Sequence, residues 1–311
     1  MYLIEKEQFE RFPVQMVELA KMAEEMGYEV SWVDKWSGGL MEINGRFFGY
    51  GLIPKFPLNS GISRQLVRDK VYGYMLMEKN GIKVPEGDYF FRYDEKYLKQ
   101  TEGKGVQEAI EFASRLNYPV FVKPNRGALG RDCKLVINVE ELKDGLEKIW
   151  TSDFMAIIQR VLNGREYRVM FLDGEVILAY EKSKLYVEGD GITNLKQKAK
   201  KQESRIKKQD EEKILKKGER YYLTDVANLS GGGVVVGVVD DYSDGLKNLV
   251  KKISDVFDLR YGGIDFIGGD VNNVDELTVF EVNADPGLEG FLEFDRERGM
   301  GVLQKLLKAS F

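Results

Sequence analysis

The sequence predicts an α/β (α+β) protein, because segments with a helical repeat of apolar residues alternate with short apolar strands and glycine-containing turns. Residues 9–27 carry apolar side chains on or near one helical face, and the strand "YEVSWVD" follows after Gly27. A chain of 311 residues is long enough for about two domains. We therefore expect an α/β chain with about two hydrophobic cores.

The later elements follow in chain order from the same two periodicities. Residues 36–60 are rich in glycine, proline and aromatic residues and predict a short hairpin with loops. A helix covers residues 63–81, and Asn138 caps a helix over residues 139–150. Further helices are predicted at 106–117, at the highly charged stretch 195–220 and at 299–308. Strands are predicted at 82–91, 118–124, 133–137, 155–162, 260–268 and 277–283, and a pair of strands within 166–182 is joined by a turn at Asp173 and Gly174.

The chain contains no histidine, which restricts its chemistry. Histidine triads, histidine general bases and the usual zinc and iron sites are excluded. Any chemistry must therefore depend on carboxylates, lysines, arginines, amides and backbone dipoles, with or without a hard metal ion such as magnesium.

The composition also limits the location and partners of the protein. Apolar content of 43% and charged content of 31% are typical of a soluble globular protein. No apolar run approaches the ~20 residues that span a bilayer, and the charged N-terminus does not resemble a signal peptide. A single cysteine favours a reducing cytoplasm, and a net charge of −5 gives no reason to expect nucleic acid. We expect a cytoplasmic protein with neither membrane nor nucleic acid as partner.

The stretch "FVKPNRGALGRD" is the first with a chemical interpretation. Lys123 stands at the end of a predicted strand, and a loop containing Gly127 and Gly130 follows. Free backbone N–H groups beside a lysine suit a polyphosphate. The alternative is a surface hairpin with a solvated lysine. The spacing does not match a Walker motif.

The stretch "AIIQRVLNGREYRV" is the second. An apolar strand leads into a linker at Val161 and Leu162, a turn, and then Glu166 on the next strand. Such a linker can offer backbone groups to a purine edge while the carboxylate holds ribose hydroxyls. The alternative is a plain hairpin in which Glu166 pairs with Arg168 or Lys182.

The third candidate site joins the strands "GGIDFI" and "VFEVN". Alternation along the strands places Asp265, Glu281 and Asn283 on one face of the sheet. Two carboxylates this close repel each other unless a cation lies between them, and magnesium prefers oxygen ligands of this kind. The alternative is that the carboxylates point to solvent, but the flanking apolar residues favour a half-buried face.

Two further stretches remain open between function and structure. "ANLSGGGVVVG" places Asn228 before three glycines, which suits either an anion site or a flexible bend. The lysine-rich residues 195–220 suit either a solvated surface or a segment that attracts an anionic substrate such as an acidic amino acid or peptide.

Seven stretches in this order resemble the ATP-grasp superfamily of carboxylate–amine ligases. The resemblance is strongest to the ATP-grasp module of cyanophycin synthetase and of bifunctional glutathione synthetases, and weaker to D-alanine–D-alanine ligase. It covers roughly residues 63–290. The stretches are "VRDKVYGYMLMEKNGIKVPEG", "YPVFVKPNRGALGRD", "IIQRVLNGREYRV", "VEGDG", "ANLSGGG", "GGIDFI" and "VFEVNADPGL".

The resemblance implies a nucleotide site between two lobes. Lys70 and Lys123 would bind ATP phosphates, and residues 125–131, with Gly127 and Gly130, would form a flap over them. The adenine-binding linker corresponds to Gln159, Arg160, Val161 and Leu162, the ribose carboxylate to Glu166, and the ligands of Mg²⁺, or Mn²⁺ as an alternative, to Asp265, Glu281 and Asn283. Asn228 would lie in the acceptor region.

The resemblance also implies a domain plan and a reaction. It implies an ATP-grasp fold with two α+β lobes at residues 66–160 and 161–311, behind a small α/β domain at residues 1–65. ATP would convert the carboxylate of an amino acid or peptide into an acyl phosphate, which an amine attacks; Lys123, Arg168, Asn228 and Asn283 are the expected catalytic residues. An ATP-grasp kinase, a thioester-forming ligase and a non-catalytic nucleotide-binding protein remain alternatives, and a homodimer remains open.

The sequence departs from these relatives at two points. D-alanine–D-alanine ligases carry an arginine two residues before the first metal-binding aspartate, where this chain has Gly263. Cyanophycin-type modules carry an arginine just before the Asn-x-Ser stretch, where this chain has Thr224 and Asp225. The candidates for supplying the missing positive charge are Arg168, Arg126 and Arg131.

Overall fold

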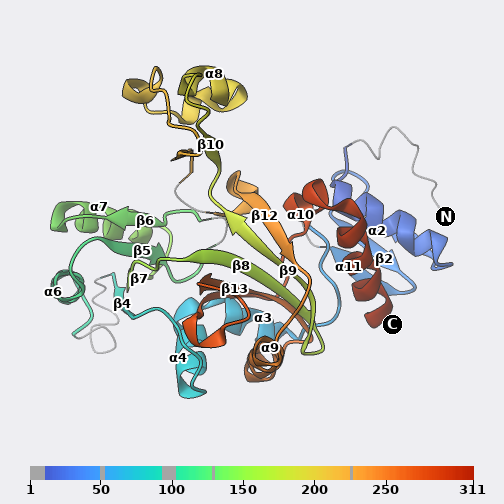
Figure 1. Ribbon diagram of the computed structural model, residues 1–311. Helices are drawn as coiled ribbons and strands as arrows, with labels where there is room; N and C mark the ends of the chain where they lie inside the picture. Colours follow the sequence, from blue (N-terminus) through green and yellow to red (C-terminus); the bar gives the residue numbers. More distant parts are fainter. Residues whose placement is uncertain (1–10, 50–52, 93–102, 128–129, 225–226) are drawn as a thin grey trace.

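The chain folds into three α/β parts and one projecting segment. The computed structural model describes residues 11–49, 53–92, 103–127, 130–224 and 227–311. Figure 1 shows the central lobe at one end, the N-terminal unit with the last helices at the other, and the five-stranded sheet of the C-terminal lobe between them. In the part of the chain that is described, no helix is long and apolar enough to cross a membrane.

The central lobe is a four-stranded antiparallel sheet covered on one face by two helices. Its strand order is β4-β7-β5-β6. The strands are β4 (Gly87–Phe91), β5 (Val120–Pro124), β6 (Lys134–Val136) and β7 (Met155–Arg160), and the helices are α6 (Val106–Leu116) and α7 (Val139–Trp150). Asn138 caps α7 as predicted, since its side chain accepts a hydrogen bond from the Glu141 N–H. Among the described residues of the lobe, both helices pack on this one face.

The C-terminal lobe is built on a five-stranded antiparallel sheet, in the order β12-β9-β8-β13-β14. The strands are β8 (Arg165–Leu172), β9 (Glu175–Ser183), β12 (Val234–Val239), β13 (Tyr261–Gly268) and β14 (Thr278–Asn283). The turn between β8 and β9 is at Asp173 and Gly174, both at positive φ, as the sequence predicts. Asp265 lies directly opposite Glu281 in the β13–β14 register and opposite Arg168 in the β13–β8 register.

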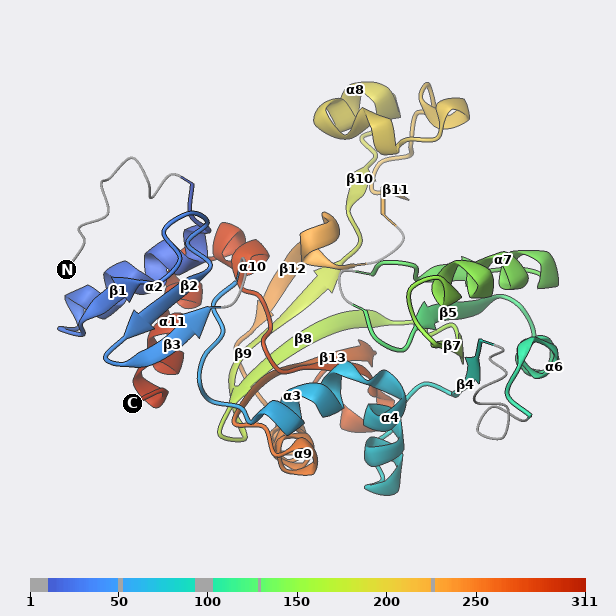
Figure 2. The same cartoon turned by 180° about the vertical axis from the view of Figure 1, so that it is seen from behind.

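One face of this sheet packs against α9 (Asp244–Phe257), which the sequence analysis did not assign. The helix is nevertheless encoded locally. Ser243 caps it, and its buried residues recur at helical spacing. These residues are Leu246, Val250, Ile253 and Phe257. Figure 2 shows α9 on the same side of the sheet as α3 and α4.

The predicted helix over residues 63–81 is wrong in one respect, because two helices stand there. These are α3 (Gly61–Arg68) and α4 (Lys70–Lys79), and Asp69 between them has an extended backbone. The Asp69 side chain accepts a hydrogen bond from the Tyr72 N–H, so it ends one helix and caps the next. Both helices pack in the same core as α9 and β13. The domain boundary at residue 66 therefore stays a prediction.

The N-terminal unit shares its core with the end of the chain. It contains α2 (Val14–Glu25) and an antiparallel sheet of β1 (Val30–Trp32), β2 (Leu40–Ile43) and β3 (Arg46–Gly49), and it packs against α10 (Glu289–Phe294) and α11 (Arg296–Ala309). Residues 9 and 10 of the predicted first helix lie outside the described residues. The shared core includes Met41 and Phe48 from this unit, Met170 and Tyr180 from the large sheet, and Leu306 from α11.

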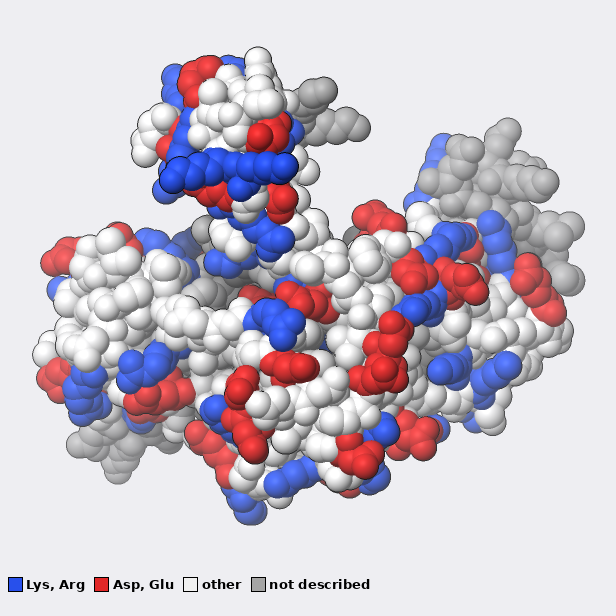
Figure 3. Space-filling model, viewed as in Figure 1, with Lys and Arg blue, Asp and Glu red and all other residues white. Residues whose placement is uncertain are grey.

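The segment between β9 and β12 projects from the body of the protein (Figure 1). It contains β10 (Tyr186–Glu188), β11 (Arg220–Tyr222), the short helix α8 (Leu195–Ala199), and 3-10 turns at Lys200–Arg205 and Lys208–Asp210. The prediction of one charged helix over 195–220 is therefore wrong. A few apolar residues, among them Leu195, Ile206 and Leu215, form a separate small core. The chain must change direction between these residues to bring them together, so one straight helix cannot form this core. Figure 3 shows side chains of both charge signs on the segment.

Candidate active site

The free face of the central-lobe sheet carries two residues predicted to bind nucleotide. Successive side chains of a strand point to opposite faces, and Val122 and Ile158 pack in the core under α6 and α7. Lys123 and Gln159 therefore lie on the other face. Lys123 is hydrogen-bonded to the Tyr74 hydroxyl, which donates to the Phe280 carbonyl on β14, so this face is turned toward the C-terminal lobe.

Two lysines meet beside Glu281. The Lys70 Nζ lies 3.4 Å from the Glu281 Oε1 and donates a hydrogen bond of 3.0 Å to the Gly127 carbonyl. The Lys123 Nζ donates a hydrogen bond of 2.6 Å to the Tyr74 hydroxyl. Burial lowers the pKa of Lys123 to about 8, although Glu281 acts in the opposite direction. The structure thus brings together both lysines that the sequence assigned to ATP phosphates.

The start of α4 is fastened to the loop that follows β5. The Asn125 Oδ1 accepts a hydrogen bond of 2.9 Å from the Val71 N–H, and the Asn125 carbonyl accepts one of 3.4 Å from the Lys70 N–H. Arg126 lies 3.1 Å from the buried carboxylate of Asp69. These contacts hold Lys70, the first residue of α4, beside Asn125 and Arg126 at the start of the predicted flap.

Only part of that flap is described. Residues 128 and 129, within the predicted flap 125–131, lie outside the described residues. Gly130 has a φ of 69°, which favours glycine, and its carbonyl accepts a hydrogen bond from the Cys133 N–H. A role of this loop over a triphosphate remains a prediction.

Asp265 lies at the centre of a buried ion-pair network. Its side chain is 0% exposed, and Arg168 donates hydrogen bonds of 2.8 Å to each of its oxygens. The Lys182 Nζ lies 2.9 Å from the Asp265 Oδ1. Burial by itself would raise the pKa of Asp265, but Arg168 and Lys182 hold it at about 2. The carboxylate is therefore ionised and paired with two cations, and the alternative that it points to solvent is wrong.

The glycine at position 263 leaves the space that Arg168 occupies. A Cβ at Gly263 would lie 3.1 Å from the Arg168 Cδ and 2.9 Å from the Pro286 Cβ. Of the three arginines that could replace the missing charge, Arg168 is therefore the one that crosses Gly263 and reaches Asp265. Arg126 instead pairs with Asp69. The departure from the relatives at Gly263 thus has a steric explanation.

The predicted metal ligands lie close together, but they differ in exposure and in how many of their oxygens are already paired with cations. The Asn283 Nδ2 lies 3.3 Å from the Asp265 Oδ2 and 3.3 Å from the Glu281 Oε2. Glu281 keeps 28% of its side chain exposed, whereas both oxygens of Asp265 already have cationic partners. Among the described residues no group of three His, Cys, Asp or Glu side chains forms a metal cluster. Two carboxylates and one amide fit Mg²⁺, with Glu281 the more accessible carboxylate.

The predicted adenine linker follows β7 directly. Gln159 is 5% exposed, and its Oε1 is buried without a hydrogen-bond partner among the described residues. It lines a cavity of about 210 Å³ between α4, β4 and β7. The Arg160 side chain pairs with Glu86 at 2.7 Å, and the Arg160 N–H donates a hydrogen bond of 2.8 Å to the Glu86 carbonyl. Val161 and Leu162 are half-buried.

Sequence reasoning gave Tyr74 no role at this site, and it considered Lys182 only as a structural partner of Glu166. Lys182 lies 3.8 Å from the Glu166 Oε2 and connects the predicted ribose carboxylate to Asp265. Burial raises the pKa of Glu166, and Lys182 counteracts this. Glu166 and Lys182 are opposite each other in the β8–β9 register, so the hairpin pattern contained this signal. The ion pair between Glu166 and Lys182, which was the structural alternative for Glu166, is therefore present and forms part of the network around Asp265.

Asn228 begins a glycine turn at the base of the projecting segment. Its carbonyl accepts hydrogen bonds from the Gly231 and Gly233 N–H groups. Arg205 of the projecting segment donates a hydrogen bond of 3.0 Å to the Gly231 carbonyl, and Gly232 has a φ of 99°. The turn is therefore ordered by backbone contacts and by Arg205. A direct role of Asn228 in catalysis remains a prediction.

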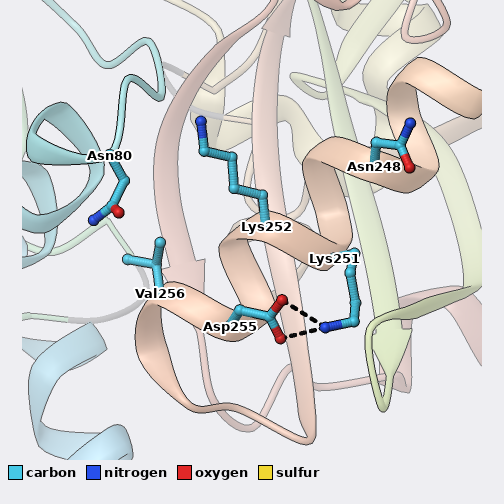
Figure 4. Close-up of a pocket in the computed structure, with 6 residues that line it drawn as sticks. All are labelled: Asn80, Asn248, Lys251, Lys252, Asp255 and Val256. Carbon is cyan, nitrogen blue, oxygen red and sulfur yellow. Dashed lines mark hydrogen bonds and ion pairs between the residues drawn. The ribbon is translucent and has the colours of Figure 1, made fainter.

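A larger hollow of about 400 Å³ lies elsewhere on the surface, between the end of α4 and α9 (Figure 4). Its lining includes Asn80, Asn248 and Lys252, together with Lys251 and Asp255, which pair with each other. None of the residues predicted for the site lines this hollow. The candidate active site is defined instead by the side chains that converge between the two lobes.

The fold is that of the ATP-grasp ligases. A bifunctional glutathione synthetase from Pasteurella multocida superposes with a TM-score of 0.59 over 97% of this chain and 44% of that protein, at 18% identity. A D-alanine–D-alanine ligase from Bacillus anthracis superposes with a TM-score of 0.52 over 81% of this chain and 68% of that protein, at 17% identity. The expected ATP-grasp fold is therefore confirmed.

The chain belongs to the family described as D-ala D-ala ligase C-terminus, which matches residues 76–302. Among curated relatives, cyanophycin synthetase from a Synechocystis strain is 27% identical over 259 residues, which are 72% of this chain and 28% of that protein. The chain thus spans less than a third of the length of this relative. The resemblance inferred from the seven stretches is confirmed for the family.

Proposed function

We propose that this chain is an ATP-dependent carboxylate–amine ligase that forms an amide or peptide bond on an amino acid or peptide. ATP transfers its γ-phosphoryl group to the carboxylate, the amine attacks the acyl phosphate, and ADP and phosphate are released. The family and the relatives named above support this class of reaction. The single cysteine supports a location in a reducing cytoplasm.

One observation carries the proposal: cationic and acidic side chains from both lobes converge at the end of β14. Lys70 and Lys123 lie around Glu281, and Arg168 and Lys182 lie around Asp265. A polyphosphate with a divalent ion needs this combination of lysines and carboxylates. The pair of Glu281 and Asn283, with Asp265, would hold Mg²⁺, which supplies charge neutralisation for the β- and γ-phosphates when it is bound.

The other residues have supporting roles in the proposal. The buried acceptor Gln159 Oε1 suits the amino group of adenine, and Glu166 suits ribose hydroxyls. Arg168, which pairs with Asp265, would stabilise negative charge that develops on the reacting carboxyl group. No nucleophile from the protein is required, which agrees with a chain that lacks histidine.

A phosphate-release screen tests the reaction class. With Mg-ATP and pairs of amino acids, we expect phosphate only when a carboxylate and an amine are both present. Phosphate transfer to a hydroxyl without an amine would indicate a kinase instead. Tight Mg-ATP binding without turnover over a broad range of acceptors would indicate a non-catalytic nucleotide-binding protein.

Cys133 provides a test of the nucleotide site that does not need the substrate. It is the only cysteine of the chain, it is half-buried, and it lies within electrostatic reach of Lys123, Lys70 and Glu281. Burial raises the pKa of its thiol, so alkylation is best followed at mildly alkaline pH. Mg-ATP at ten times its Kd should slow alkylation roughly tenfold, because only the free protein reacts. Magnesium without nucleotide is the control, and unchanged alkylation under saturating Mg-ATP would contradict the location of the site.

A further inference from the structure

Tyr74 is half-buried between the two lobes and contacts both of them. Its hydroxyl accepts a hydrogen bond of 2.6 Å from the Lys123 Nζ on β5 and donates one of 2.6 Å to the Phe280 carbonyl on β14. The Lys123 ammonium also lies 5.1 Å from the centre of the Tyr74 ring. Burial raises the pKa of the Tyr74 hydroxyl, and Glu281 acts in the same direction, so this group stays protonated and can donate.

The tyrosine belongs to the same helix as the other phosphate lysine. Lys70 is the first residue of α4, and Tyr74 follows one turn later on the same side. Lys70 contacts the side chain of Glu281, while Tyr74 contacts the backbone of the preceding residue, Phe280. Both lysines are therefore connected to residues 280–281 of β14. Lys70 contacts Glu281 directly, and Lys123 is connected through Tyr74.

We propose that Tyr74 is a positioning residue that holds Lys123 against the metal-binding strand, so that the lysine meets the phosphates of the nucleotide in a fixed place. This inference rests on the proposed function. Lys123 is 4% exposed, and the Tyr74 hydroxyl is the acceptor for its buried ammonium group. Without that hydroxyl the ammonium loses its hydrogen-bonded connection through Tyr74 to the Phe280 carbonyl, and its position relative to β14 is no longer fixed.

Tyr74→Phe is the variant that tests this, since it keeps the ring and removes only the hydroxyl. We expect the Kd for Mg-ATP to rise about tenfold, the effect of a hydrogen bond lost from a charged group. The Kd for adenosine, which has no phosphate, should stay within about twofold. Tyr72→Phe on the same helix is the matched control, because Tyr72 is 54% exposed, and it should change neither constant.

A double-mutant cycle shows whether Tyr74 acts through Lys123. In a Lys123→Met background, Tyr74→Phe should have no further effect on the Kd for Mg-ATP, because the group that it positions is gone. Additive effects of the two substitutions would overturn the proposal. An equal loss of adenosine and Mg-ATP affinity in Tyr74→Phe would also overturn it, since that indicates a structural defect.

The outcomes also separate this inference from the proposed function. If the unmodified protein binds Mg-ATP and Tyr74→Phe binds it equally well, the inference is wrong and the proposed function stands. If the unmodified protein binds neither Mg-ATP nor adenosine, the proposed function fails and the inference fails with it. The binding constants can be measured by calorimetry on the full chain.

Discussion

Glu281→Gln should reduce kcat/KM for the ligase reaction by at least about 100-fold, because it removes the negative charge from the more accessible predicted metal ligand. The substitution keeps the size of the side chain, and 28% of that side chain is exposed. The magnesium concentration that gives half-maximal activity should rise as well. Steady-state phosphate release at varied magnesium measures both effects.

Glu293→Gln on α10 is the matched control, since Glu293 is an exposed carboxylate outside the proposed site. It should leave kcat/KM and the magnesium dependence within about twofold of the unmodified protein. A Glu281→Gln protein that keeps the activity of this control would show that Glu281 does not hold the metal. A fall in activity with an unchanged magnesium dependence would also count against the assignment.

Arg168→Met should lower the free energy of unfolding by roughly 3–5 kcal/mol, because it leaves a fully buried carboxylate with one cation fewer. Arg168 makes both of its hydrogen bonds to Asp265, which is 0% exposed. Among the described residues, Lys182 then remains as the cation that pairs with Asp265. Urea unfolding followed by circular dichroism measures the change.

Arg165→Met on the same strand provides the comparison. Arg165 pairs with Glu181 at 3.5 Å, but its side chain is 53% exposed. Solvent screening makes such a pair weak, so the change should stay below about 1 kcal/mol. If the two variants lost the same small amount of stability, the buried network around Asp265 would not have the importance that its geometry indicates.

Sequence reasoning identified the types of residue in the candidate site better than the contacts between them. Period-2 alternation placed Glu281 and Asn283 on one face and Asp265 beside them, and the β13–β14 register confirms that Asp265 and Glu281 are opposite each other. It did not predict that Arg168 and Lys182 would both form ion pairs with Asp265. Strand pairing between distant segments determines that contact, and no local pattern encodes it.

The wrong helix predictions have the same origin. Residues 63–81 carry a helical pattern throughout, but Asp69 is satisfied both as a cap and by Arg126, which is 57 residues away in sequence. The charged stretch 195–220 lacks an apolar stripe long enough for one helix, and its few apolar residues gather in a separate core. In both cases a tertiary contact outweighed a local propensity.

The sequence by itself determined the family, the types of residue in the site and the strands that carry them. These follow from local periodicity, from glycine turns and from the order of short motifs along the chain. Only the tertiary structure decided which cation neutralises which carboxylate, why position 263 is glycine, and that Tyr74 connects Lys123 to β14. Those features depend on the packing of side chains from different lobes, and pair interactions of this kind exist only once the chain has folded.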